Sequence, residues 1–387
     1  MKWLTSNLLL LLALGLLLFF GSFVRGRVWV VKPNWLAFGT GSLLLVALVI
    51  GVVQVFRGTP GQVDTVEEKP SDTFPVVPDS ALVRLRLPWD ADAAADWPAA
   101  ETLADISEIA YQSPNEAEKS YCELGFPTVM PVVQGSMIAY VITGEDVTVV
   151  AFRGTDFNEV SDWLANLGRS ATETPHGQVH KGFYDAYQSM KSQVDAILKE
   201  RNTKHLWVTG HSLGGAIALV CAYDLVEVEQ RQLNGAVTFG QPMVARQNFA
   251  DYIDTLLIGR YARFVNRDDI VPKVPPSHVA CGSLVWFTED GLLRSKAKHI
   301  LYGASESKVP AGPAVSELRD DAEVKPLTEE EFEALQAQLK AENAEKERLP
   351  EGTPMKYQAV ASPVDDHSMG LYLDKIRKLL GITPPEE

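Results

Sequence analysis

The feature that most restricts the fold of this 387-residue chain is a regular alternation of strand-like and helix-like runs between residues 99 and 302. β-branched and aromatic runs favour strands, and apolar residues three and four positions apart favour helices. Strands that alternate with helices predict an α/β domain, in which a central sheet carries helices on both faces. The expected strands are 136–143, 147–152, 205–209, 236–239 and 261–266, and the expected helices are 184–202, 213–228 and 245–256.

A short motif between one of these strands and the helix that follows it predicts a nucleophile. Residues 210–214 read GHSLG, which fits G-x-S-x-G. A strand, a sharp turn and a helix are the context in which such a serine becomes a nucleophile elbow. Gly210 and Gly214 leave the room that this close turn needs, and the helix start offers N–H groups to a developing oxyanion. Ser212 is therefore the predicted nucleophile.

A serine nucleophile needs a histidine base and an acid that orients the base. In this fold class the acid and then the histidine follow the serine along the chain. Asp268 and Asp269 come directly after the strand 261–266, at the strand end where α/β folds place ligand chemistry. The residues alone leave both aspartates open, together with the histidines that follow them. Those histidines are His278, His299 and His367.

Five motifs in a fixed order carry a family resemblance. They are FRGT at 152–155, VHKGF at 179–183, GHSLGG at 210–215, TFGQP at 238–242 and DIVP at 269–272. Together they resemble the class 3 lipases, the fungal-type triacylglycerol lipase family of α/β-hydrolases. The resemblance covers about residues 99–302 and resumes at a C-terminal histidine. It implies an α/β-hydrolase-like central sheet and a reaction that needs no metal and no organic cofactor.

The resemblance also implies roles for single residues. Ser212 matches the nucleophile and Asp269 matches the triad acid, which leaves Asp268 as a surface neighbour. Thr155 follows F-R-G and matches the oxyanion residue, whose N–H would act together with that of Leu213. Two hydrogen-bond donors that are fixed before the reaction can lower its activation barrier by an amount on the order of several kcal/mol.

The triad histidine of the family lies near the C-terminus and is followed shortly by an aromatic residue. Residues 366–372, DHSMGLY, resemble that pattern, so His367 is the expected base. His278 lies in a stretch similar to a family region outside the triad, and His299 remains the rival. No role in proton transfer is expected of the histidines in the earlier motifs, His180 and His211.

Residues 156–167, DFNEVSDWLANL, match the position of a short helical lid in the family. Their apolar side chains fall at helical spacing. Phe157 and Trp163 are the lid candidates. The alternative is an ordinary amphipathic helix packed on the core, and the pattern alone does not separate the two.

The apolar N-terminal region predicts a membrane hairpin over residues 1–57. Residues 3–24 and 33–56 carry no charged side chain, and each run can cross about 30 Å of hydrocarbon. A signal peptide is the alternative for the first run, although no A-x-A-like cleavage site follows it. The basic loop 25–34 indicates a cytoplasmic loop. The chain is therefore expected to be an integral membrane protein whose hydrolase domain lies outside the cytoplasm.

The rest of the chain divides into a tether and a domain. Residues 58–98 are rich in Pro, Asp, Ala and Thr and predict a tether, partly packed at its C-terminal end. Residues 99–387 form the lipase-like domain, interrupted by an acidic insertion at 303–350. Within the insertion a capping box precedes a narrow apolar stripe, so either a solvated surface helix or a mobile cover is possible. These residues are Thr328 and Glu331 for the box, and Phe332, Leu335 and Leu339 for the stripe.

The charge balance limits the partners. The chain has a net charge of −15, and residues 58–387 hold all 50 acidic residues, which argues against a nucleic-acid binder. The expected partners are a lipid ester substrate and a bilayer reached through residues 1–57. The expected function is that of a membrane-anchored acylglycerol lipase, with a phospholipase A1 or broad carboxylesterase as alternative and a non-catalytic binding protein as a further one. A disulfide between Cys122 and Cys281 stays open.

Overall fold

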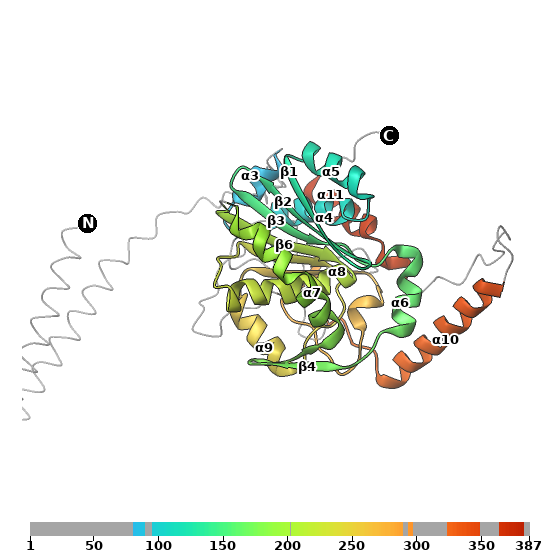
Figure 1. Cartoon of the computed structure of the whole chain (residues 1–387). Helices are drawn as coiled ribbons and strands as arrows, with labels where there is room; N and C mark the ends of the chain where they lie inside the picture. The colour runs from blue at the N-terminus through green and yellow to red at the C-terminus, as the bar shows by residue number, and fades with distance from the viewer. Residues whose placement is uncertain are drawn as a thin grey trace, which may run out of the picture. The chain divides into compact units, whose positions relative to one another are not determined.

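The structure is a computed structural model that describes residues 80–89, 95–201, 203–288, 293–296, 323–348 and 364–382 (Figure 1). The predicted membrane hairpin, residues 1–57, lies outside these residues, as does most of the predicted tether, 58–98. Among the described residues, no helix is long and apolar enough to cross a membrane. The prediction of an integral membrane protein with an extracytoplasmic domain is corrected by this finding.

The described residues form an eight-stranded sheet in the order β1-β2-β3-β6-β7-β8-β9-β10. Its five central strands, β3 to β9 in that order, run parallel, while β1, β2 and β10 pair antiparallel at the two edges. The predicted α/β class with a central sheet is therefore confirmed. The strands are β1 Thr128–Gln134, β2 Met137–Gly144, β3 Val147–Phe152, β6 His205–His211, β7 Gly235–Phe239, β8 Tyr261–Asn266, β9 Ser283–Phe287 and β10 Leu293–Lys296.

Helices cover both faces of this sheet, as the alternation of runs predicts (Figure 1). One face carries α3, α4, α5 and α11, and the opposite face carries α7, α8 and α9, with α6 and α10 at its edge. The helices are α3 Ala81–Arg86, α4 Trp97–Ile109, α5 Pro114–Glu123, α6 Val160–Asn166, α7 Lys181–Lys199, α8 Leu213–Tyr223, α9 Gln247–Leu256, α10 Glu329–Arg348 and α11 Met369–Leu380.

Successive residues of the central strands supply two separate cores. In β3, Val150 packs in the core beneath α7 and α8, whereas Val149 and Ala151 pack beneath α4 and α11. All six residues of β3 are buried, because a parallel strand covered on both faces has no solvent side. Helices on both faces of the sheet therefore hold the ends of β6, β7 and β8. The loops that follow these strands are fixed as a result.

Two segments differ from the predicted elements. The predicted helix 213–228 ends as an α-helix at Tyr223 and continues as a π-helix, Asp224–Val228. A short antiparallel pair, β4 Ala171–Thr174 and β5 Gly177–His180, connects α6 to α7 and was not predicted.

The domain boundaries themselves stay a prediction, but part of the predicted tether packs on the sheet. Leu85 of α3 is fully buried, and its carbonyl oxygen accepts a hydrogen bond from Trp207 Nε1 at 2.8 Å. The ring of Trp89 stacks on the ring of Trp207, with centroids 6.1 Å apart. Residues 80–89 thus cover a strand of the central sheet rather than extending away from it.

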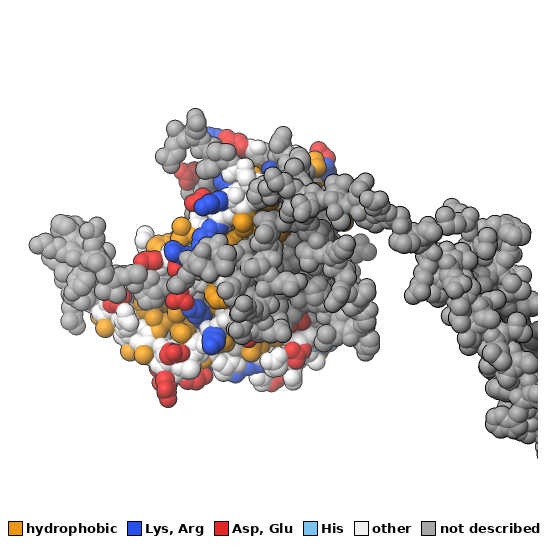
Figure 2. Space-filling model, turned by 180° about the vertical axis from the view of Figure 1, so that it is seen from behind, with side chains coloured by type: hydrophobic (Ala, Val, Ile, Leu, Met, Phe, Trp, Pro, Cys, Tyr) orange, Lys and Arg blue, Asp and Glu red, His pale blue; other side chains and the backbone are white. Residues whose placement is uncertain are grey.

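The face of the described residues that is visible in Figure 2 carries no single kind of side chain. Seen from behind, acidic, basic and hydrophobic side chains are interspersed over the visible described area (Figure 2). Cys122 is exposed, whereas Cys221 and Cys281 are buried, and none of the three takes part in a disulfide. The possible disulfide between Cys122 and Cys281 is therefore not formed.

Candidate active site

The backbone turns sharply at Ser212, between β6 and α8. Its φ of +58° and ψ of −131° lie in a region that non-glycine residues rarely adopt, so the turn stores strain. The Ser212 N–H donates to the Phe239 carbonyl oxygen at 2.9 Å, which ties the turn to the end of β7. This strand–turn–helix is the geometry of a nucleophile elbow.

The two glycines of the motif are required by close packing, as predicted. A Cβ added to Gly214 would lie 2.1 Å from the carbonyl oxygen of Phe152, at the end of β3. A Cβ on Gly210 would lie 2.5 Å from the carbonyl group of Gly214. Backbone atoms occupy both spaces, and backbone cannot move aside as a flexible side chain could. Any larger residue at either position would force β6 and α8 apart.

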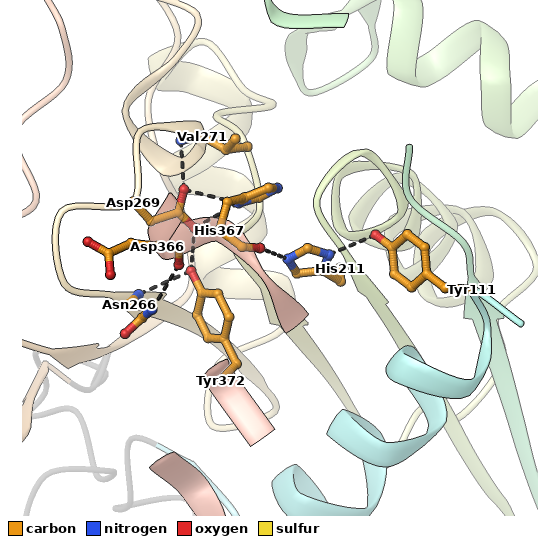
Figure 3. A network of polar contacts seen from close by, with 8 residues as sticks. All are labelled: Tyr111, His211, Asn266, Asp269, Val271, Asp366, His367 and Tyr372. Atoms are coloured by element: carbon orange, nitrogen blue, oxygen red, sulfur yellow. Dashed lines mark hydrogen bonds and ion pairs between the residues drawn. The ribbon is translucent and has the colours of Figure 1, made fainter. Parts of the chain in front are cut away.

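An acid and a base meet in the loops beside the elbow (Figure 3). His367 Nδ1 lies 2.8 Å from Asp269 Oδ2 and 3.0 Å from Oδ1, and neither side chain is exposed. The same carboxylate accepts from the Val271 N–H at 2.9 Å and from the Tyr372 hydroxyl at 2.5 Å. With three donors around it, the carboxylate is fixed in orientation. It holds the Nδ1 proton of His367 and leaves Nε2 free to accept another.

A glycine at the end of β7 makes space for this pair. Gly240 has a φ of +55°, and a Cβ there would lie 2.8 Å from His367 Cε1 and 3.0 Å from Asp269 Oδ2. The Gly240 N–H donates to the Phe264 carbonyl oxygen at 3.0 Å. The TFGQP motif thus combines a left-handed backbone with a close approach of side chains, and both require glycine.

A second histidine holds the main chain of the first. His211 Nε2 donates to the His367 carbonyl oxygen at 2.7 Å, and the Tyr111 hydroxyl bonds His211 Nδ1 at 2.7 Å (Figure 3). Burial, with a smaller contribution from His367, lowers the pKa of His211 well below its usual range. His211 is therefore a neutral group that holds the main chain at His367, and its lack of a role in proton transfer stays a prediction.

The two atoms that would react are both enclosed. Ser212 Oγ and His367 Nε2 are buried and have no hydrogen-bond partner among the described residues. Neither side chain has exposed surface. Buried polar atoms without a hydrogen-bond partner cost free energy. Two such atoms at the candidate site indicate that it is arranged to pair with a bound substrate.

The loop after β3 crosses directly over the serine. A Cβ on Gly154 would lie 3.1 Å from Ser212 Cβ and 2.2 Å from the Tyr111 hydroxyl oxygen, so this loop also needs glycine. Thr155, the expected oxyanion residue, comes next and is half-buried. Leu213, the other expected donor, is the first residue of α8. The backbone of both residues therefore adjoins Ser212.

The lid segment does contain a helix. A 3₁₀ turn, Phe157–Glu159, leads into α6, and α6 buries Val160 and Leu164 in the core beneath it. The two lid candidates differ: Phe157 is 47% exposed, whereas Trp163 is half-buried against the same core. The role of α6 as a lid stays a prediction.

The rival residues lie elsewhere. Asp268 is exposed and forms an ion pair with Lys273. His278 is buried beside His180, with ring centroids 5.2 Å apart, and both of its ring nitrogens are unpaired among the described residues. Burial lowers the pKa of His278 to about 4. His299 lies outside the described residues.

An acidic cluster far from the elbow surrounds a lysine. Lys191 Nζ lies 2.5 Å from Asp224 Oδ2, 2.8 Å from Glu229 Oε1 and 2.9 Å from Asp195 Oδ2. The ammonium group occupies the centre that a metal ion would take. Among the described residues, no other group of three or more His, Cys, Asp or Glu side chains could hold a metal.

Sequence reasoning did not identify three of the supporting residues by role. Tyr372 was noted only as an aromatic that follows His367, and its bond to Asp269 depends on the first turn of α11. Tyr111 carries no local signal, because it lies 100 residues from its partner His211. Gly240 stands within a quoted motif, and its contact with the acid–base pair was not inferred.

Comparison with known proteins finds a family model that matches part of this chain. A model of the class 3 lipase family, "Lipase (class 3)", matches residues 149–279. A lipase of Rhizomucor miehei is 35% identical over 159 residues, which cover 38% of this chain and 43% of that protein. Phospholipase A(1) DAD1 of Arabidopsis thaliana is 30% identical over 176 residues, covering 37% and 39%.

The similarity is partial in length. A secreted mono- and diacylglycerol lipase of Malassezia globosa, MDL3, is 33% identical over 141 residues, covering 33% of this chain and 46% of that protein. The chain thus spans less than half the length of each of these relatives. Among solved structures, the native propeptide complex of Rhizomucor miehei lipase is 28% identical, with a TM-score of 0.44, covering 50% of this chain and 69% of that one.

The comparisons bear on the predicted family resemblance. The matched residues 149–279 include all five quoted motifs. The family resemblance is therefore confirmed, since residues 149–279 match the class 3 lipase model.

Proposed function

We propose that this chain is a serine hydrolase that cleaves carboxylic ester bonds of lipids, with acylglycerols as the main substrates. The observation that carries the proposal is the buried pair of His367 and Asp269, joined at 2.8 Å beside a serine on a strained elbow. Class 3 lipases provide the substrate class, since the relatives of this domain are named lipases.

The proposed reaction proceeds through an acyl-enzyme. His367 Nε2 accepts the Ser212 hydroxyl proton while Oγ attacks the ester carbonyl carbon, and Asp269 stabilises the resulting imidazolium. The oxyanion is stabilised by the N–H groups of Thr155 and Leu213. The tetrahedral species collapses, and the alcohol leaves with the proton from His367. Water then attacks the acyl group, returns a proton through His367 and releases the fatty acid.

The orientation of the acid supports this reaction. Nδ1 of His367 must keep its proton throughout, because only then can Nε2 accept and return one. The Asp269 carboxylate is turned toward Nδ1 and is held there by Val271 and Tyr372. The chain itself therefore supplies every group that the proposed mechanism uses.

A phospholipase A1 is the second candidate, favoured by the 30% identity with a relative named phospholipase A(1). It would use the same triad and differ in the head group of the ester. Hydrolysis of triolein, phosphatidylcholine and p-nitrophenyl esters of several chain lengths separates these candidates from a broad carboxylesterase. The acylglycerol proposal requires triolein to be the best of these substrates.

The enzyme proposal itself is tested by covalent labelling with a fluorophosphonate in the presence of detergent micelles. We expect label on the wild type and on the control Asp268→Asn, whose side chain is exposed, and none on Ser212→Ala. Failure to label the wild type would instead favour a non-catalytic binding protein. Equal labelling of Ser212→Ala would place the nucleophile elsewhere.

A further inference from the structure

The helix of the acidic insertion packs on the lid segment. α10 lies alongside α6 at the edge of the domain (Figure 1). Its apolar stripe, Phe332, Leu335 and Leu339, is 0%, 9% and 1% exposed, in the same core cluster as Val160 and Leu164 of α6. The predicted capping box also forms, and it fixes where α10 begins. The described helix of the insertion is therefore packed along one side rather than solvated on all sides.

One polar side chain of α10 binds the end of α6. Gln336 Nε2 donates to the carbonyl oxygens of Leu164 and Leu167, both at 3.0 Å. The last carbonyl groups of a helix have few partners within the helix, so a donor from another element stabilises that end. Gln336 therefore holds the C-terminal end of α6 in addition to the apolar contact along its side.

A charged contact lies beside this one. Arg169, shortly after α6, pairs with Glu329 and Glu333, and its guanidinium lies 5.9 Å from the centre of the Phe332 ring. These side chains are between 38% and 64% exposed, so solvent weakens the ion pairs. The apolar stripe and Gln336 are expected to dominate the contact.

The two ends of the lid segment are anchored to the body of the domain. Gly154 is packed against Ser212, and the Gly168 carbonyl oxygen accepts from His180 Nε2 at 2.9 Å. Between these anchors α6 packs on α10, which lies outside the family match because the match ends at residue 279. Ser212 is fully buried, so part of its cover has to move for a substrate to enter, and α6 is the helix of the lid segment.

We propose that α10 is a brace, built from the acidic insertion, that holds α6 closed over Ser212 and must separate from α6 before an ester can bind. The proposal rests on the proposed function, since it concerns entry to that site. Separation exposes the apolar stripe and the facing side of α6. The open state is therefore stabilised by a lipid surface that covers both, and disfavoured in water.

The first experiment measures hydrogen–deuterium exchange, which does not depend on activity. Gln336→Ala and Leu339→Ala should each raise exchange of the α6 amides about three- to tenfold, as expected from losing two hydrogen bonds or a buried apolar contact. The control Gln338→Ala, an exposed residue of α10 that bonds only to Glu342, should not. Amides of β6 should be unchanged in all three. Unchanged α6 exchange in both test variants overturns the proposal.

The second experiment measures turnover of a soluble short-chain ester. Gln336→Ala should increase kcat/KM by about the same factor as it increases α6 exchange, because the open fraction limits entry. Gln338→Ala should match the wild type. A decrease in Gln336→Ala, with normal folding, would mean that α10 supports the active form and would overturn the proposal.

The third experiment prevents the separation. Asn166→Cys with Gln336→Cys, in a Cys122→Ser background, is bridged by a bifunctional methanethiosulfonate, since Gln336 reaches the carbonyl groups on both sides of Asn166. The bridge should reduce triolein hydrolysis at least about tenfold, and a reductant should restore it. Asn166→Cys alone with the same reagent is the control. Full activity of the bridged protein would show that separation is not required.

These arms distinguish the two proposals. If Ser212 is not labelled and no ester is hydrolysed, the proposed function fails, while the exchange arm still decides whether α10 restrains α6. If labelling and hydrolysis succeed but exchange and bridging have no effect, only the brace fails.

Discussion

The elbow with its acid–base pair and the lid with its brace are held by different kinds of contact. At the elbow, Ser212, Asp269 and His367 have no exposed surface, and strand ends fix the loops that carry them. At the lid, one apolar stripe, one glutamine and two exposed ion pairs join α6 to α10. The difference is the one expected if the proposed reaction centre is preorganised and the proposed cover separates at lower cost.

Backbone sterics explain the rigidity of the first region. Gly154, Gly210, Gly214 and Gly240 each lie where an added Cβ would meet backbone or an active-site side chain within 3.0 Å. Such positions tolerate no repacking, whereas an apolar stripe tolerates truncation at about 2–5 kcal/mol per large side chain. Substitutions at the elbow should therefore lower the activity. Substitutions that weaken the contact between α6 and α10 should instead raise the turnover of a soluble ester.

The largest effect is expected at the base. His367→Ala should reduce kcat for ester hydrolysis by about 10⁴-fold, because the proposed mechanism then lacks the base that accepts the Ser212 proton. Ester hydrolysis is measured beside circular dichroism, which should be unchanged. His278→Ala is the matched control, since His278 is also buried but its ring forms no hydrogen bond to Asp269. This variant should retain most of the activity. Comparable losses in both variants would contradict the assignment.

A smaller loss is expected from Gly240→Ala. The added Cβ would press on His367 and Asp269 and would also adopt a φ of +55°. We expect kcat to fall about 10²-fold, a typical result of displacing a catalytic group by part of an ångström. Gly135→Ala separates the two causes, because Gly135 has a φ of +62° with nothing within 4 Å of its added Cβ. It should lower thermal stability without lowering kcat.

The free energy of unfolding is expected to depend on pH through His278, which lies beside His180. Burial lowers the folded-state pKa of His278 to about 4, so its contribution to stability is present above the unfolded pKa, near 6.5, and is lost as the pH falls toward 4. His278→Phe should remove about 2 kcal/mol of that loss between pH 7 and pH 4, as measured by urea unfolding.

The comparison with the wild type at each pH is necessary for this prediction. Asp96 and Asp105 have pKa values raised to about 6, chiefly by burial, so their contributions change in the opposite direction as the pH falls. They are common to both proteins and cancel in the difference. If the free energy of unfolding changes equally with pH in the variant and the wild type, the prediction is wrong.

The smallest effect is expected from the exposed charges beside the brace. Arg169→Gln removes the ion pairs with Glu329 and Glu333, and we expect a change in Tm of no more than about 1 °C. Exchange of the α6 amides should also stay near the wild-type rate. A large increase in exchange would mean that charge, rather than the apolar stripe and Gln336, holds the brace.

The comparison also explains what the sequence could predict. The elbow and the strands beside it were predictable because their signals are local: glycine spacing, a β-branched run and an apolar helix within about fifteen residues. The family resemblance supplied Asp269 and His367, which the residues alone left open. The structure then brings these two side chains together at 2.8 Å across 98 residues of chain.

The cover was less predictable because its partners are remote in sequence. Phe332, Leu335 and Leu339 were recognised as an apolar stripe, but a stripe does not say what covers it. Gln336 lies 172 residues from Leu164. The contact from Tyr111 to His211 was missed for the same reason, since a single tyrosine at the end of a helix carries no pattern.

Full burial of Ser212 has a consequence for covalent inhibitors. A reagent that attacks the serine cannot meet it in the closed form, so its apparent rate is the intrinsic rate multiplied by the open fraction. Compounds screened in plain buffer would then be ranked by their capture of a rare conformation rather than by their chemical reactivity. The same compounds tested with lipid present would follow a different order, and the change in order would itself report the opening equilibrium.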